Sequence, residues 1–511
     1  MLRKNKQFNR EEATVNLFTE FEKSAKAHAD LVCITYEDQD YSFARILSSS
    51  KRLAARLLEI APGNSSEAEN HIALLAPNLP GFVIGFYGTL AANKTTVPLN
   101  FLLNPNEIMT IGAHAGIRTI IAAGPFYEKA TEMAQTLPIT VIRAEDYLDD
   151  GPAPDLPAVT RGDDDTAVLM YTSGTTGTPK GVELTHANIY DNYNSVKDAW
   201  PFHTGNSFIC VLPLFHSFGM LAKLILPNFL GARVVLVPQF APQKLAEYFN
   251  TYPECIFFAV APMFNVLALL ARTKGLKYPN LRLCVTGAAA LPMNIKNHWE
   301  SVTGIDLYQG YGLTEASPAV SFNLPEAHVP GTIGRSIKNV EVQIWDDDNH
   351  LLPNGEIGEL MVRGKNVMKD YYKNPEETAR TIAPDGWLHT GDLARMDDQG
   401  YITIAGRKKE LIISAGENIY PLEIEDVLLS HPAVNEAAVI GVPHPSKGEE
   451  PKAYVAPVPG MSVDVAELRA LCREKLASFK VPGDFEIRES LPKGPTGKLL
   501  KRVLEAEIGK G

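Results

Sequence analysis

HIALLAP at residues 71–77 opens the stretch of sequence that decides the fold. It is followed by LPGFVIGFYGTLAAN (79–93), TTVPLN (95–100), NPNEIMTIGAHAG (104–116) and RTIIAAG (118–124). Short apolar runs typical of buried strands alternate here with longer helical runs. Because a strand, helix, strand order needs right-handed crossovers, the strands lie parallel and helices cover both faces of their sheet.

The same alternation returns between residues 167 and 308, where CIFFAV, LRLCVTG and IDLYQG are typical of buried strands. After about Gly331, period-2 runs separated by turns such as Asn354-Gly355 predict an antiparallel meander. Beyond Arg407, a unit of roughly a hundred residues mixes three strands with two helices. The fold class is therefore α/β. We expect a large N-terminal domain over residues 1–406, with mostly parallel sheets covered by helices plus the meander, and a small α+β domain over residues 407–511.

Composition narrows the class of protein. The 511 residues are 45% hydrophobic and 21% charged, which excludes disordered, collagen-like and coiled-coil chains. A net charge of −12 argues against a broad nucleic-acid-binding surface. The five scattered cysteines suggest neither disulfides nor zinc, and a reducing, cytoplasmic location fits them best. We identify no targeting signal, and the most apolar windows are too short for membrane spans, although peripheral membrane contact stays open.

YTSGTTGTPKG at residues 171–181 is the strongest local signal for chemistry. It follows the apolar run TAVLM and precedes an expected helix that Thr185 would cap. Glycines let backbone N–H groups converge on an anion, while the hydroxyls and Lys180 add donors and charge. The spacing is not that of a Walker loop. The segment predicts a phosphate-binding loop, and the bland alternative is a flexible Gly/Thr linker.

QGYGLTE at residues 309–315 is expected to form a loop at the carboxyl end of a strand, where open α/β sheets bind ligands. Tyr311 could stack on a base, Thr314 could bond a phosphate oxygen, and Glu315 could ligate Mg²⁺. A plain turn with an exposed glutamate is the alternative. GAAALP, at residues 287–292, is a second turn, whose small side chains would let a flat ring or an acyl chain approach the backbone.

Three further residues complete the candidate set. Asp392 in Thr390-Gly391-Asp392 could accept hydrogen bonds from both hydroxyls of a ribose, and Arg407 could support the same sugar or a phosphate. Lys498 lies in PTGK near the end of the chain. Taken alone, a lysine on such a turn is usually just solvated.

Together, YTSGTTGTPKG, GYGLTE, WLHTGD, GRKKELI with GENIYPLEIE, and PTGK resemble the acyl-adenylate-forming superfamily, and fatty acyl-CoA synthetases most of all. The resemblance runs from about residue 27 to residue 502. It implies a mobile C-terminal domain, an active site between the two domains, and ATP, Mg²⁺ and CoA as cofactors.

The resemblance also implies the role of each residue. Lys498 is the catalytic lysine, assisted by Thr314 and Glu315, and Glu315 holds the metal. Lys409 is the hinge. The ribose contacts are Asp392 and Arg407, and Tyr311 stacks on the adenine. The remaining cofactor-binding residues lie on the phosphate loop, on two turns near the nucleotide and at the pantetheine tunnel: Thr172, Ser173, Gly174, Thr175, Thr176, Gly177, Thr178, Lys180, Gly287, Ala288, Gln309, Gly310, Gly312, Ala415 and Gly416.

The acid site is expected in LPLFHSFGM, residues 212–220, and in AVAPMF, residues 259–264. The mainly apolar helix that should follow residue 220 favours an alkyl chain of medium or long length. Lys223 is the exception, with a stem we expect to be buried and a head that reaches water or a carboxylate. The predicted substrate-binding residues are Phe215, His216, Phe218, Gly219 and Ala261.

The predicted function is thus an ATP-dependent acid–thiol ligase that converts a medium- or long-chain fatty acid to acyl-AMP and then to acyl-CoA. The alternatives are transfer to acyl carrier protein, an aryl or dicarboxylic acid as substrate, and a non-enzymatic acyl or nucleotide sensor. The expected partners are a small carboxylic acid and CoA. No nucleic acid is expected as a partner, and the protein is expected to be a monomer or a homodimer. A docking face for an acidic carrier protein would consist of exposed basic residues, and the candidates are Lys447, Lys452, Lys480 and Lys493.

Replacement of Lys498 by alanine should nearly abolish acyl-AMP formation yet spare thioester formation from supplied acyl-AMP. The lysine is needed only while charge spreads over the α-phosphate during adenylation. Single-turnover assays of the two half-reactions measure this. Equal loss of both would contradict the assignment.

Overall fold

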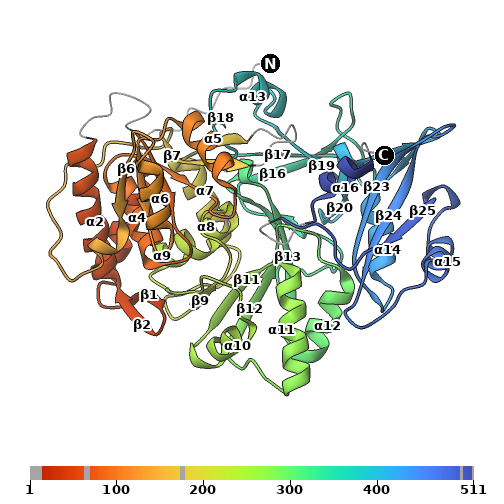
Figure 1. The fold of residues 1–511 in the computed structure, drawn as a ribbon, viewed down its shortest axis with the longest axis horizontal. Coiled ribbons are helices and arrows are strands. Elements are labelled where there is room, and N and C mark those ends of the chain that lie inside the picture. The colour runs from red at the N-terminus through yellow and green to blue at the C-terminus, as the bar shows by residue number, and fades with distance from the viewer. Residues whose placement is uncertain (1–13, 62–69, 173–178, 495–498, 509–511) are drawn as a thin grey trace, which may run out of the picture. The chain divides into compact units, whose positions relative to one another are not determined.

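The computed structural model describes residues 14–61, 70–172, 179–494 and 499–508 (Figure 1). The chain divides into two compact units. The first comprises Met1–Asn194, Pro213–Leu236 and Met368–Asn374, and the second comprises Ser195–Leu212, Val237–Val367 and Pro375–Gly511. The predicted boundary between residues 406 and 407 lies inside the second unit and stays a prediction.

A seven-stranded sheet forms the centre of the first unit. Its strand order is β18-β8-β7-β4-β3-β5-β6. The five strands from β7 to β6 run parallel, whereas β8 and β18 add antiparallel pairs at one edge. The strands are β3 (His71–Leu75), β4 (Thr95–Pro98), β5 (Thr119–Ala122), β6 (Thr140–Arg143), β7 (Thr166–Thr172), β8 (Lys180–Thr185) and β18 (Asp370–Tyr371).

The alternation of strands and helices after residue 71 is confirmed. Helix α4 (Pro80–Ala91) is buried on every side, which explains why its sequence is apolar throughout. Helix α5 (Pro105–Ala115) begins at a capping box formed by Asn104 and Glu107 and ends at Gly116, whose φ of 67° is left-handed. These sequence signals set the limits of the helices that cover the sheet.

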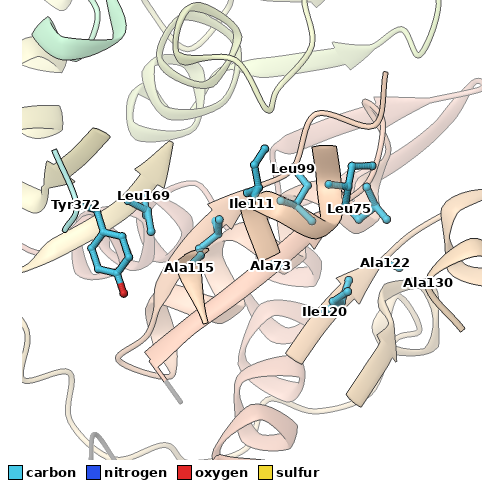
Figure 2. Packing of buried hydrophobic residues seen from close by; sticks show 12 residues of the cluster. Ala73, Leu75, Leu99, Ile111, Ala115, Ile120, Ala122, Ala130, Leu169 and Tyr372 are labelled. Carbon is cyan, nitrogen blue, oxygen red and sulfur yellow. The ribbon is translucent and has the colours of Figure 1, made fainter. Parts of the chain in front are cut away.

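One face of the sheet packs against α5 in a cluster of buried side chains (Figure 2). Ile111 from the helix lies beside Leu99 and Leu75, and Tyr372 joins the cluster from the segment that carries β18. Burying apolar area on this scale is the main stabilising contribution to the unit. Tyr372, which follows every other member by at least 203 positions (372 − 169), therefore takes part in this core.

The first unit also contains a smaller group of strands. In this group β1 (Val32–Tyr36) pairs in parallel with β10 (Arg233–Leu236) and antiparallel with β2 (Gln39–Ser42). The other described helices that begin in this unit are α1 (Leu17–Ala27), α2 (Phe43–Ile60), α6 (Phe126–Ala134), α7 (His186–Lys197), α8 (Ser217–Met220) and α9 (Leu226–Leu230). The last residues of α7 belong to the second unit.

The second unit contains three groups of strands. In the first group, β9, β11, β12 and β13 run parallel, and β14 and β15 continue antiparallel from β13. Helices α11 and α12 pack side by side in this unit (Figure 1). The strands are β9 (Ser207–Cys210), β11 (Cys255–Ala259), β12 (Leu281–Thr286), β13 (Leu307–Gly312), β14 (Ala319–Phe322) and β15 (Arg335–Ser336).

The predicted meander and C-terminal strands are confirmed. The antiparallel order β16-β17-β19-β20 follows the chain, and the last sheet has the order β22-β21-β24-β23 with β25 parallel to β24. The strands are β16 (Val340–Trp345), β17 (Gly358–Gly364), β19 (Leu388–Met396), β20 (Ile402–Arg407), β21 (Ile412–Ser414), β22 (Glu417–Ile419), β23 (Val434–His444), β24 (Gly448–Pro457) and β25 (Asp484–Ile487).

With these sheets the predicted α/β fold class is confirmed, including the mostly parallel N-terminal sheets and the α+β C-terminal part. Across the described ranges, no helix combines the length and apolarity that a membrane span requires. The helices of the second unit besides α7 are α10 (Pro242–Thr251), α11 (Ala261–Lys274), α12 (Met293–Thr303), α13 (Pro375–Thr381), α14 (Pro421–Leu429), α15 (Val465–Lys475) and α16 (Lys501–Ile508).

The helix predicted after the phosphate-loop segment is confirmed: α7 starts at His186, and the Thr185 hydroxyl accepts the Asn188 N–H over 3.1 Å, after β8 has paired back onto β7. One local prediction is wrong. The loop expected from residue 309 is strand β13 as far as Gly312, paired with β14. A Cβ at Gly312 would lie 2.1 Å from the Pro318 carbonyl oxygen, so that glycine serves close strand contact.

Candidate functional site

The first group of candidate residues lies at the antiparallel edge of the seven-stranded sheet. Lys180 is the first residue of β8, and its Nζ lies 5.2 Å from the centre of the Tyr371 ring on β18. The Tyr372 N–H donates to the Gly181 carbonyl over 2.8 Å. Strand β18 thus holds Lys180 by a backbone hydrogen bond to its neighbour and by a cation–π contact.

The strand before the loop has a support of its own. The Tyr171 hydroxyl lies 2.7 Å from Nδ1 of His114 on α5. Partial burial and the nearby charge of Lys373 lower the pKa of His114, so the neutral ring can accept the Tyr171 proton. Both arms of the predicted phosphate loop are therefore anchored. Thr172 and Lys180 are the described ends of that loop, and residues 173–178 lie outside the described residues.

The second group joins three predicted nucleotide-binding residues. Asp392 on β19 lies opposite Arg407 on β20, and its Oδ1 is 3.0 Å from the arginine Nε. The Tyr311 hydroxyl, at the end of β13, donates to the other carboxylate oxygen over 2.6 Å. The structure therefore brings Tyr311, Asp392 and Arg407 into one cluster, although they are far apart in the sequence.

Electrostatics in this cluster favour a neutral Tyr311 phenol and a charged Arg407. Burial and the adjacent Asp392 carboxylate raise the pKa of Tyr311 well above its ordinary value. Burial alone would lower the pKa of Arg407, but Asp392 and Glu410 outweigh it, and the net pKa is raised. Glu315 also contributes to the field at Arg407. The cluster therefore offers a carboxylate acceptor and a permanent cation, the groups that bind a ribose or a phosphate.

Glu359 supports this cluster and was not singled out from the sequence. It is only 7% exposed and lies on β17, next to a register shift against β19. Its Oε1 accepts the Gly391 N–H over 3.0 Å, and its Oε2 lies 3.1 Å from Lys408 Nζ. Gly391 has a left-handed φ of 71°. Glu359 thus holds the bend in β19 that presents Asp392.

No sequence signal distinguished Glu359 from an ordinary strand residue. Its burial follows from the pairing of β17 with β19. These strands are separated by about 25 residues, so their pairing could be identified only from the structure. The neighbouring Thr390 hydroxyl donates to the Leu360 carbonyl over 2.7 Å and accepts the Asp392 N–H over 3.1 Å. Both of these bonds stabilise the same bend.

Thr314 and Glu315 lie in a short 3-10 turn, residues Thr314–Ala316, directly after β13. Thr314 is buried and Glu315 half-buried. One carboxylate oxygen of this kind fits Mg²⁺ at a nucleotide, because the ion takes its other ligands from phosphates and water. Gly287 and Ala288 form the turn after β12, where Ala288 has a left-handed φ of 66°. The segment is a turn of small residues, as predicted.

The predicted nucleotide residues of β13 lie in a tightly packed strand. Gln309 pairs with Thr286 on β12, immediately before the turn at Gly287. A Cβ at Gly310 would lie 2.4 Å from the Phe322 ring, so this position leaves no room for a side chain. The pairing places Gln309 and the turn at the same end of adjacent parallel strands, where ligands bind in open sheets.

The predicted acid-binding segment begins with buried side chains. Phe215 is 5% exposed and its ring packs edge to face on Phe101, with centroids 5.1 Å apart. His216 and Phe218 are half-buried, and Gly219 is buried in α8. Ala261, the first residue of α11, is buried in the second unit.

The helix expected after residue 220 is present, but its first turn is not α-helical. Residues Leu221–Ile225 form a π-helical turn between α8 and α9, a feature frequent at functional sites. Lys223 lies in this turn and is 0% exposed. Its head therefore does not reach water, because the whole side chain is enclosed, and the other expectation, a contact with a carboxylate, stays a prediction.

Ala415 and Gly416 form the two-residue tip of the β21–β22 hairpin. Their φ values of 51° and 87° are both left-handed, as a tight hairpin turn requires. An alanine in this conformation is strained, and the Ala415 N–H bond of 2.7 Å to the Lys447 carbonyl helps to hold it. Lys409, the predicted hinge, is exposed in the 3-10 turn Lys408–Glu410. Lys498 lies outside the described residues.

Comparison with known proteins identifies the family. The model of the AMP-binding enzyme family matches residues 21–372, more than half of the chain, and the model of the AMP-binding enzyme C-terminal domain matches residues 423–498. The chain belongs to the AMP-binding enzyme family. The resemblance to acyl-adenylate-forming enzymes is thereby confirmed.

Relatives within the AMP-binding enzyme family differ in substrate. The chain is 33% identical to a long-chain-fatty-acid–CoA ligase from Bacillus subtilis (strain 168), over 95% of this chain and 93% of that protein. It is 35% identical to a feruloyl-CoA synthase from Amycolatopsis sp, over 93% of this chain and 94% of that protein. The comparisons support the coarser part of the predicted function: the chain is an ATP-dependent acyl-CoA ligase.

A solved structure of a relative with bound ATP and magnesium supports the predicted cofactors. The o-succinylbenzoate CoA synthetase from Bacillus subtilis, solved with ATP and a magnesium ion, superposes with a TM-score of 0.85 at 30% identity, over 95% of this chain and 99% of that chain. The same enzyme has been solved with its acyl-adenylate. ATP, Mg²⁺ and CoA are the cofactors expected of such an AMP-binding ligase.

Replacement of Glu359 by alanine should raise KM for ATP by about tenfold, since a hydrogen bond to a charged group contributes about 1.5 kcal/mol or more. The Gly391 N–H loses its acceptor, so Asp392 is presented less well to the nucleotide. Steady-state kinetics with varied ATP measure the change, and Glu359→Gln, which keeps an acceptor, should restore most of the affinity.

Asp347→Ala is the matched control for this substitution, because Asp347 is the other carboxylate on Lys408, at 2.8 Å, and its side chain is 88% exposed. Its KM for ATP should stay within about twofold of wild type, as exposed ion pairs contribute little. An unchanged KM in Glu359→Ala would show that Gly391 does not need this support.

Proposed function

We propose that this AMP-binding enzyme is a fatty acid–CoA ligase that activates a carboxylic acid of medium or long chain length. The observation that carries the proposal is the composition of residues 213–230, the segment predicted to contact the acid. Most of its buried members are apolar, with Leu214, Met220 and Leu221 all under 10% exposed, and the buried polar exceptions are Ser217, Lys223 and Asn228. An alkyl chain needs apolar contacts along its length and few polar ones.

In the first half-reaction, a carboxylate oxygen of the acid forms a bond to the α-phosphorus of ATP, and the bond to pyrophosphate breaks. The protein must orient this attack and neutralise the spreading charge. We assign Tyr311 to the adenine, Asp392 and Arg407 to the ribose, and Lys180 with residues 172–178 to the departing phosphates. Lys498 would contact the reacting carboxylate and the α-phosphate.

Glu315 would be the protein ligand of Mg²⁺, with Thr314 at a phosphate oxygen. When bound, this ion supplies positive charge that offsets the charge on the phosphates. In the second half-reaction, the thiol sulfur of CoA forms a bond to the acyl carbonyl carbon, and AMP leaves with the electrons of the broken bond. The thiol proton passes to water, and because a thiol has a pKa of about 8.5, no dedicated base is required.

We further propose that residues 407–511 turn about Lys409 between the two half-reactions. Lys409 is exposed in a single short turn between β20 and β21, so a change of its φ and ψ would disturb few contacts. This rotation would withdraw Lys498 and present the Ala415-Gly416 tip to the pantetheine arm. The left-handed tip extends from two short strands, which suits approach to a narrow tunnel.

A carrier-protein acceptor is the less favoured alternative. The four basic residues considered as a docking face each pair with a carboxylate: Lys447 with Glu450, Lys452 with Asp484 and Glu486, Lys480 with Glu423, and Lys493 with Glu436. Their charge is largely neutralised within the protein, so they do not form a strongly basic surface. This observation favours CoA as the acceptor.

The proposal predicts the outcome of a panel of acids and acceptors. With ATP and Mg²⁺, pyrophosphate release should be fastest with unbranched fatty acids of about eight or more carbons, because each buried methylene contributes about 0.8 kcal/mol. Ferulate, benzoate and a dicarboxylate of matched length form the other arm. A coupled pyrophosphate assay with CoA or acyl carrier protein as acceptor measures both preferences.

Higher kcat/KM with ferulate or benzoate than with every fatty acid would overturn the fatty-acid proposal while leaving an AMP-forming ligase. Acyl transfer to carrier protein but not to CoA would overturn the choice of acceptor. Pyrophosphate release without any acid serves as the background control.

Lys223→Met tests the dicarboxylate alternative. If the substrate is a plain fatty acid, the substitution changes octanoate and dicarboxylate activity by the same factor, since Lys223 then contributes only to the fold. Lys296→Met is the matched control, as Lys296 is another buried lysine, on α12 and paired with Glu300. Selective loss of dicarboxylate activity in Lys223→Met alone would instead assign Lys223 to the distal carboxylate.

A further inference from the structure

Lys501 forms the centre of a buried ion cluster in the C-terminal part of the chain. It is the first residue of α16, three positions after Lys498. Its Nζ lies 2.8 Å from Oε2 of Glu410 and 2.7 Å from Oε1 of Glu425. The side chains of Lys501, Glu410 and Glu425 are 14%, 24% and 9% exposed. None of the three is part of the site described above.

Each carboxylate in this cluster belongs to a different element. Glu425 lies on α14 and accepts the Val439 N–H of β23 over 2.7 Å, so it is fixed to the C-terminal sheet. Glu410 follows Lys409 directly and is the last residue of the 3-10 turn at the predicted hinge. Lys501 therefore connects the start of α16 both to the sheet and to the hinge turn.

The two carboxylates keep Lys501 in its charged form. Burial alone would lower the pKa of Lys501, but Glu425 and Glu410 outweigh burial and the net pKa is raised. Lys501 thus stays protonated across the range in which the enzyme would work. Removing a partner from a buried ion pair leaves an uncompensated charge, so the contacts resist separation.

The Lys501 cluster also interacts electrostatically with the cluster of Tyr311, Asp392 and Arg407. Glu410 contributes to the field that raises the pKa of Arg407, and Arg407 contacts Asp392 over 3.0 Å. One carboxylate, Glu410, therefore interacts both with Arg407 before the hinge and with Lys501 beyond it. A change at the hinge alters the surroundings of both.

We propose that Lys501 is a positioning residue for the adenylation half-reaction: its contacts with Glu410 and Glu425 tie the start of α16, three positions after Lys498, to the hinge turn and to the C-terminal sheet, so that these three described elements move as one body. The proposal rests on the function proposed above and adds a residue to it. Lys501 does not touch the substrate. It acts through Lys498, whose placement within a fraction of an ångström the reaction requires.

The alternative is that the cluster only stabilises the fold. A stabilising role would lower both half-reactions in proportion to the folded fraction. A positioning role lowers adenylation selectively, because thioester formation from supplied acyl-AMP does not use Lys498. The ratio of the two half-reaction rates therefore separates the roles.

The experiment compares Lys501→Met, Lys501→Arg and the control Arg502→Met in the full-length enzyme. Arg502 is the exposed next residue of the same helix. In Lys501→Met, single-turnover adenylation should fall roughly 10- to 100-fold, as misplacement by about 1 Å can cost this much. Thioester formation from supplied acyl-AMP should stay near wild type. Lys501→Arg should recover most of the adenylation rate, and Arg502→Met should leave both rates unchanged.

An unchanged ratio in folded Lys501→Met overturns the proposal, whether both rates fall together or neither falls. If that variant does not fold by circular dichroism, Glu425→Gln replaces it, because it keeps an acceptor for the Val439 N–H and the Lys501–Glu410 contact while it weakens the link from Lys501 to the C-terminal sheet. The same ratio and the same criterion then apply.

The ratio is measured with whichever acid the wild-type enzyme adenylates fastest. A preference for an aryl acid would defeat the fatty-acid proposal without affecting the outcome for Lys501. Conversely, an unchanged ratio with a fatty acid as the best substrate would defeat the Lys501 proposal alone.

Discussion

The contact between Asp392 and Arg407 is the interaction on which the cluster of Tyr311, Asp392 and Arg407 depends. It joins two neighbouring strands, and it leaves the second carboxylate oxygen to the Tyr311 hydroxyl. Three strands from different parts of the second unit converge on one carboxylate. The surrounding hydrogen bonds from Glu359 and Thr390 have a common effect, which is to hold the backbone of β19 in the bend that presents this group.

The sequence predicted the architecture well where the physical signal is local. Apolar runs of strand length separated by helical runs required a parallel sheet, and the helical run expected at residues 104–116 forms α5 between its caps Asn104 and Gly116. Glycines misled, because a glycine in a turn and a glycine under a neighbouring strand look alike in sequence. Gly310 and Gly312 belong to the second kind, and that distinction depends on β14, which comes later in the chain.

The site was predicted unevenly for the same reason. Tyr311, Asp392 and Arg407 stand in recognisable motifs, and the structure brings them together. Glu359 and Lys501 carry no motif of their own, and their roles come from partners that only the folded chain supplies. The burial of Lys223 could not be foreseen either, since a lysine in an apolar helix normally extends its head to solvent.

Strand β18 has a consequence for how the chain folds during synthesis. The first unit takes its edge strand and the core residue Tyr372 from Met368–Asn374, after some 130 residues that belong to the other unit. Until the ribosome has released that segment, β8 presents an open edge to any other unpaired strand. The first unit therefore cannot be completed as an early folding domain, and a nascent chain halted before residue 368 would expose a surface on which molecular chaperones act.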